Sequence, residues 1–160
     1  MHKIFLTKPE CELINGAEKI VELFGGFPSM EDGELLDIRV QKCGEHRSTV
    51  SLLFDITGWK NNAMYYKKLK DFSETLICFT FNNCRDVFMQ SPLGISGEIK
   101  FSNSADRSRM YQDDTPDTVP VIERPYCAFY IRDASCLIIE FFENECTISA
   151  EIVKQSDYRY

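Results

Sequence analysis

The chain has 160 residues, of which 44% are hydrophobic and 27% charged, and this composition excludes a disordered chain and predicts one globular domain over residues 1–160. The net charge of −7 argues against direct nucleic-acid binding, because an acidic surface repels phosphates, and it suits a basic protein partner.

The start of the chain, residues 1–10, has no sustained apolar segment of the kind that secretory signals carry. Apolar runs elsewhere are only a few residues long, far short of the ~20 residues that a membrane helix needs. We therefore expect a cytoplasmic protein without a membrane span. The oligomeric state is left open.

The first predicted element is an amphipathic helix over residues 14–24. Its apolar positions recur at spacings of three and four, namely Ile14, Ala17, Ile20, Val21 and Phe24. Asn15 is the expected N-cap, with Glu18 three residues later as in a capping box. Gly25 and Pro28 are expected to end the helix, whose apolar stripe should face the core.

Beyond the helix the hydrophobic period changes to two, which predicts strands. Strands are expected at residues 36–41, 49–56, 75–81, 87–89, 126–132, 137–143 and 146–153, with a weaker pattern at Ile95, Ile99 and Phe101. Residues 43–47 should form a short loop, and Asn82 and Asn83 can supply the positive φ angles of a hairpin turn. The last three strands are interpreted as a meander.

These elements predict an α+β fold, either a mainly antiparallel sheet or a small sandwich, with one N-terminal amphipathic helix packed against it. Two segments interrupt the strand pattern. Residues 58–72 are polar apart from a few large side chains, and they fit a long hairpin loop or a short helix. Residues 102–125 hold three prolines and must be mostly loop.

Side chains suited to catalysis are few. Only His2 and His46 titrate near neutral pH, and His46 lies in an expected turn, where we predict a solvated side chain. An acidic cluster could supply paired carboxylates, but a loop of this kind is more often acidic for solubility; its members are Glu31, Asp32, Glu34 and Asp37.

The seven cysteines show no C-x-x-C spacing and are expected to be reduced structural thiols. The chain contains no zinc-protease or calcium-loop motif, no phosphate-binding glycine loop and no nucleophile elbow. We therefore expect no metal, no cofactor and no enzymatic activity.

The two irregular segments offer residues for binding another protein, because loops on a rigid sheet often carry such contacts. Trp59 and Tyr111 are candidate aromatic anchors. Asp113, Asp114 and Asp117 are candidate charges for a basic partner.

Residues 18–38 resemble the opening of the bacterial immunity-protein-fifty family, whose members accompany polymorphic secreted toxins. In that family a short helix ends in an aromatic-Gly-aromatic-Pro-Ser turn, followed by His-Asp, a small residue, Glu and an apolar strand. The matching residues here are Phe24, Gly25, Phe27, Pro28, Ser29, Asp32, Glu34, Leu35 and Leu36. One extra glycine is present, and Glu31 replaces the histidine. The motif also has a purely structural explanation, since Pro28 stops a helix and Leu36 can enter the core.

The resemblance implies a protein that binds a cognate toxin and neutralises it by covering a functional surface. A second hypothesis is a small-molecule-binding or enzymatic β-domain, with a pocket between helix and sheet lined by Phe79, Phe81, Phe129 or Phe141. A third is a structural subunit, which would carry a broad apolar surface patch.

Overall fold

The computed structural model describes residues 5–31, 33–58, 75–93, 98–103, 126–132, 135–142 and 144–154. Their elements are α1 (Lys8–Glu12), β1 (Ile14–Asn15), α2 (Ala17–Phe24), β2 (Glu34–Gly44), β3 (Arg47–Asp55), β4 (Thr75–Cys84), β5 (Asp86–Gln90), β6 (Glu98–Asn103), β7 (Tyr126–Arg132), β8 (Ser135–Phe141) and β9 (Thr147–Lys154).

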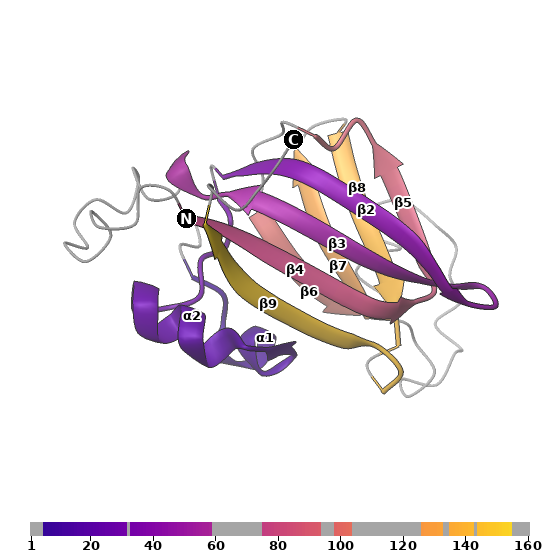
Figure 1. The fold of residues 1–160 in the computed structure, drawn as a ribbon, viewed down its shortest axis with the longest axis horizontal. Coiled ribbons are helices and arrows are strands. Elements are labelled where there is room, and N and C mark those ends of the chain that lie inside the picture. Colours follow the sequence, from indigo (N-terminus) through magenta and orange to yellow (C-terminus); the bar gives the residue numbers. More distant parts are fainter. Residues whose placement is uncertain are drawn as a thin grey trace.

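The described strands form two sheets that face each other as a sandwich (Figure 1). One has the order β1-β9-β4-β3-β2 and the other β5-β8-β7-β6. β1 pairs with β9 in parallel, and the other pairs are antiparallel. The predicted α+β, mainly antiparallel fold is confirmed.

The short helix α1 was not predicted, although its signal is present in the sequence. Thr7 and Glu10 form a capping box, in which the Glu10 backbone N–H donates to Thr7 Oγ1 at 3.4 Å and the Thr7 N–H donates to Glu10 Oε1 at 3.0 Å. Pro9 lies in the first turn, where a missing N–H leaves no helical hydrogen bond unmade. Reciprocal capping explains why so short a segment is helical.

The predicted helix begins three residues late, because Ile14 and Asn15 form β1 beside β9. The N-cap is Gly16, not Asn15, and its φ of 87° is one that glycine adopts without strain. A Cβ on Gly16 would lie 2.6 Å from the backbone oxygen of Ala150 in β9. The chain can therefore turn from β1 into α2 this close to β9 only at a glycine.

Helix α2 ends as predicted, at Gly25 with a φ of 77°, whose N–H donates to the Val21 carbonyl oxygen. Helix α2 contacts β9 and helix α1 contacts β1, and both helices lie toward the β9 edge of the sandwich (Figure 1). Ala17, Ile20 and Phe24 are buried in the core, as predicted, but Val21 is 36% exposed. The helix thus covers one end of the core.

Strands β2 and β3 form the predicted hairpin, with Glu45 and His46 as its two-residue turn. The pairing is irregular at Leu36, between the pairs Leu35 with Phe54 and Asp37 with Leu53. The extra residue puts Leu35, rather than the predicted Leu36, into the buried core. The bulge also explains why strict alternation from Leu36 was a misleading guide.

The predicted hairpin at Asn82 and Asn83 is wrong. Asn83 does have a positive φ of 68°, but β4 and β5 belong to different sheets. The register of β4 on β3 shifts between the pairs Val50 with Phe81 and Ser48 with Cys84. This bulge bends the end of β4 out of its sheet and directs the chain into the other one.

The predicted C-terminal meander is only half right. β7 and β8 form a hairpin, but β9 pairs with β4 and β1 in the opposite sheet. The turn at Asn144 and Glu145 is therefore a second crossing between the sheets. The boundary of the predicted loop at 102–125 also moves, because β6 continues to Asn103.

The core lies between the two sheets and consists of their inward-facing apolar side chains. Phe81 connects the layers, with ring centroids 6.4 Å from Phe79 of β4 and 6.0 Å from Phe141 of β8. Phe79 also contacts Phe27 and Phe54, at 5.5 and 5.7 Å. Each fully buried phenylalanine contributes about 1.5–3 kcal/mol. These aromatic contacts hold the sandwich together.

Residues 27–30, which lie within the segment compared above with the immunity family, form a buried turn. Phe27 and Ser29 are fully buried; the Phe27 carbonyl accepts from the Leu6 N–H, and the Ser29 carbonyl accepts from the Ile99 N–H of β6. A Cβ on Gly26, the extra glycine, would lie 2.5 Å from the Phe5 ring. The turn therefore ties together the N-terminal segment, α2 and β6, in keeping with the structural explanation of the motif.

Candidate protein-binding surface

The five residues predicted to bind a partner lie outside the described part of the chain: Trp59, Tyr111, Asp113, Asp114 and Asp117. Their placement in the two irregular segments stays a prediction. The described residues carry other surface groups that could contact a macromolecule.

Of the residues considered for catalysis, His2 and Asp32 lie outside the described part of the chain. His46 has an 89% exposed side chain in the β2–β3 turn, as predicted for a solvated residue. In the acidic cluster, Asp37 accepts a hydrogen bond from Arg39 Nε at 3.0 Å, and Glu34 is exposed at the start of β2. The described residues contain no group of three or more side chains suited to holding a metal ion.

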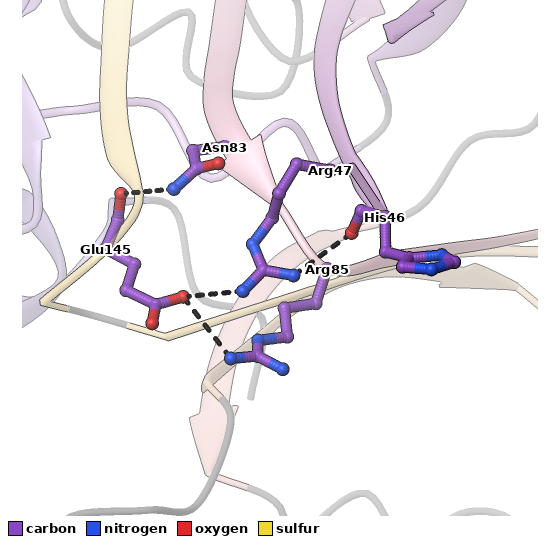
Figure 2. Close-up of polar contacts among 5 residues, drawn as sticks. All are labelled: His46, Arg47, Asn83, Arg85 and Glu145. Atoms are coloured by element: carbon purple, nitrogen blue, oxygen red, sulfur yellow. Dashed lines mark hydrogen bonds and ion pairs between the residues drawn. The ribbon is translucent and has the colours of Figure 1, made fainter. Parts of the chain in front are cut away.

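A cluster of charged residues lies at the end of the sandwich where the chain crosses between the sheets. Figure 2 shows Arg47 of β3 and Arg85 of the β4–β5 connection pointing toward the carboxylate of Glu145 in the β8–β9 turn. Glu145 Oε2 is 3.3 Å from Arg47 Nη2 and 3.6 Å from Arg85 Nη2. One carboxylate is thus shared by two guanidinium groups, and the three side chains carry one net positive charge.

Backbone and aromatic contacts hold this arginine cluster in place. Asn83 Nδ2 donates to the Glu145 carbonyl oxygen at 3.2 Å, and the Arg85 N–H donates to the Glu140 carbonyl oxygen at 2.8 Å. The Arg85 guanidinium lies 4.2 Å from the centre of the Phe142 ring, within the range of a cation–π contact. The positive charge is therefore presented from an ordered position, with Arg85 itself 39% exposed.

The strand that begins next to Arg85 carries an unusual number of exposed apolar side chains. Phe88 and Met89 in β5 are 50% and 47% exposed, and Leu93 just beyond it is 57% exposed. Consecutive residues of a strand point to opposite faces, so the exposure of both Phe88 and Met89 reflects the position of β5 at the end of its sheet. We name Arg85, Phe88, Met89 and Leu93 the β5 surface.

Sequence reasoning missed the β5 surface because alternation marks apolar residues without saying which strand ends a sheet. Residues 87–89 were predicted as a strand that pairs with 75–81 through a hairpin. Such pairing would have covered one edge of the 87–89 strand. A signal was present in the adjacent residues Phe88 and Met89, since two large apolar neighbours cannot both face one core.

The alternative pocket-lining residues pack against one another. Phe79, Phe81 and Phe141 are buried, and the Phe81 ring contacts the other two, while the Phe129 side chain lies outside the described ones. Ser29 is the one polar residue among the described residues classed as buried. These three phenylalanines therefore belong to the core of the sandwich.

No known protein family, curated protein or solved structure matches this chain. Among the described residues, no helix has the length and apolar character needed to cross a bilayer.

Proposed function

We propose that the chain is a cytoplasmic immunity protein, which binds a cognate bacterial protein toxin and neutralises it by covering a functional surface, without catalysis. The observation that carries the proposal is the β5 surface, with its exposed apolar side chains beside an ordered arginine. The resemblance of the Phe24 to Leu36 segment supplies the class of partner.

The composition of the β5 surface suits protein recognition. Aromatic residues, methionine and arginine are enriched in interfaces, and a few such side chains supply most of the binding free energy. A toxin could therefore bury the exposed parts of the Phe88, Met89 and Leu93 side chains in its own contacts.

The net charge supports a basic toxin as the partner. A charge of −7 attracts a basic protein over distances of about a Debye length, roughly 8–10 Å, and raises the association rate. Asp113, Asp114 and Asp117 are proposed to take part in this attraction, with Trp59 and Tyr111 as further anchors. The β5 surface would then govern how slowly the complex dissociates.

The direct test is rescue by co-expression. The chain is produced in cells together with the C-terminal domain of a secreted toxin encoded beside its own gene, and survival is measured. The proposal expects survival with the unchanged chain. The double variant Phe88→Ala with Met89→Ala should lose rescue, whereas Val40→Ala, which removes an equally exposed side chain from β2, should retain it. Death of cells that contain the intact, folded chain would reject the proposal.

Purified proteins separate the two candidate surfaces. Replacing Asp113, Asp114 and Asp117 by Asn should slow toxin association and flatten its salt dependence. Phe88→Ala with Met89→Ala should mainly speed dissociation, by about tenfold or more for a loss of 1.4 kcal/mol or above. Unchanged kinetics for the aspartate variant would remove the 102–125 segment from the interface, and unchanged kinetics for the β5 variant would remove β5.

A further inference from the structure

Two cysteines far apart in the sequence meet where the sheets are joined. Cys84 ends β4, and Cys146 immediately precedes β9. β4 and β9 are paired up to Asn82 with Thr147, which places Cys146 beside the last residues of β4. Cys84 is fully buried, and Cys146 is half-buried and packed against the same core.

The bulge at Asn83 brings the two thiols together. With its left-handed backbone, Asn83 interrupts the alternation of β4, and Cys84 joins Phe81 in the core. The end of β4 thus lies beside the residue that precedes β9, and the Cys84 thiol donates to the Phe81 carbonyl oxygen at 3.4 Å. Cys84 and Cys146 are not joined by a disulfide in this structure.

This proximity makes the two thiols chemically different. Hydrogen bonding with Cys84 lowers the pKa of Cys146 and outweighs the opposing effect of burial. The hydrogen bond and then burial raise the pKa of Cys84. Cys146 is therefore the more acidic and more accessible thiol, and Cys84 keeps its proton. Such an asymmetry is typical of an attacking thiol with a resolving neighbour.

We propose that Cys146 and Cys84 form a peroxide-oxidisable thiol pair that closes into a disulfide between the end of β4 and the β8–β9 turn. The Cys146 thiolate attacks one oxygen of hydrogen peroxide, the O–O bond breaks, and Cys146 becomes a sulfenic acid as hydroxide leaves. The Cys84 sulfur then attacks the Cys146 sulfur, the S–O bond breaks, and the hydroxyl group leaves as water with the Cys84 proton. Two thiols are oxidised, and one peroxide is reduced to two waters.

This modification site is independent of the proposed function, because it requires no toxin. Closure would covalently join the two places where the chain crosses between the sheets. Glu145, next to Cys146, would keep its position beside Arg47 and Arg85. Reduction by a dithiol would restore both cysteines.

The test uses the purified full chain, reduced and then exposed to hydrogen peroxide. Non-reducing proteolysis and mass spectrometry should yield a linked pair of peptides containing Cys84 and Cys146, which dithiothreitol separates. Dimedone should label Cys146 in the Cys84→Ser variant, where a hydroxyl can still hydrogen-bond to Cys146 but the sulfenic acid has no resolving thiol. Cys146 should react about tenfold faster than buried Cys136, because its thiolate is favoured.

Matched variants identify the partner. Cys136→Ala and Cys43→Ala should both form the same linked peptides as the unchanged chain; Cys43 is the exposed cysteine whose charge also affects Cys84. A product that links Cys146 to Cys43 would overturn the assignment. So would the absence of a Cys84–Cys146 link in the unchanged chain after its thiols have been consumed, and this measurement does not depend on any variant folding.

Discussion

The strands β2 and β5 each end a sheet in the described part of the molecule, but they present different surfaces. The solvent-facing residues of β2 include Arg39, Gln41 and Lys42, whereas the exposed side chains of β5 include Phe88 and Met89. Charged residues on an end strand discourage pairing with other chains. The surface of β2 is thus typical of a solvent-exposed strand, whereas that of β5 is typical of a strand that contacts another molecule.

The difference does not come from exposure alone. Val40 in β2 is as exposed as Met89 in β5. Val40, however, shares its face of β2 with the exposed Lys42, so a partner that covered it would also have to desolvate a charge. Phe88, Met89 and Leu93 follow one another along one stretch of chain, and Arg85 at its start already has an aromatic contact. An exposed apolar residue indicates binding when its neighbours are also suited to burial.

The largest expected loss of stability comes from the core between the two sheets, and the losses expected at the surfaces of β2 and β5 can be compared with it. Phe81→Ala should lower the free energy of unfolding by about 3–5 kcal/mol, because Phe81 contacts aromatic rings in both sheets. Chemical denaturation measures the loss. Phe81→Leu, which keeps most of the volume, should lose under about 1.5 kcal/mol. A similar small loss for Phe81→Ala would mean that the sheets are not packed through this side chain.

The next effect extends the comparison to β1, the other end of the five-stranded sheet. Gly16→Ala should destabilise by about 2–4 kcal/mol, since alanine is strained at a φ of 87° and its Cβ would clash with the Ala150 oxygen. Gly25→Ala is the matched control, because Gly25 has a φ of 77° but nothing lies within 4 Å of an added Cβ. This variant should lower the free energy of unfolding by about 1–2 kcal/mol. Equal losses in thermal or chemical unfolding would contradict the close approach of β1 to β9.

A smaller effect tests the comparison directly. Phe88→Ser and Val40→Ser should each reduce stability by no more than about 1 kcal/mol, because both side chains are half-exposed. Their solubilities should differ: Phe88→Ser should require clearly more ammonium sulfate for precipitation than the unchanged chain, and Val40→Ser should barely differ from it. If Phe88→Ser unfolds the chain as Phe81→Ala does, Phe88 belongs to the core and the contrast between β2 and β5 disappears.

The smallest effect concerns the arginine cluster beside β5. Glu145→Gln removes the carboxylate that Arg47 and Arg85 share. Because this ion pair is partly exposed to solvent, the free energy of unfolding should fall by less than about 1 kcal/mol in dilute buffer. The loss should shrink toward zero in 1 M salt, where charges are screened over roughly 3 Å. Glu45→Gln, in the exposed turn, is the control and should leave stability unchanged. A loss that persists in salt would instead indicate a role for Glu145 in packing.

Much of the architecture follows from local sequence. The period of two marked the regions of most strands, Gly25 ended the helix, and the fold class was correct. The errors occur at single residues that break a period. Asn83 was predicted to reverse the chain within one sheet, but its bulge leads into the other sheet. The bulge at Leu36 exchanged the roles of Leu36 and Leu35. Alternation cannot indicate such changes, because one extra residue inverts every side chain that follows.

By itself, the sequence determined where most of the strands lie, where α2 ends and that an apolar core exists, because these depend on periodicity and on residues with restricted backbones. Only the tertiary structure decided which strands end the sheets, and so that Phe88 and Met89 face solvent while Phe79 and Phe81 do not. The tertiary structure alone places Cys84 near Cys146 and Arg47 near Glu145. Strand partners are chosen by contacts between distant residues, and no local pattern records them.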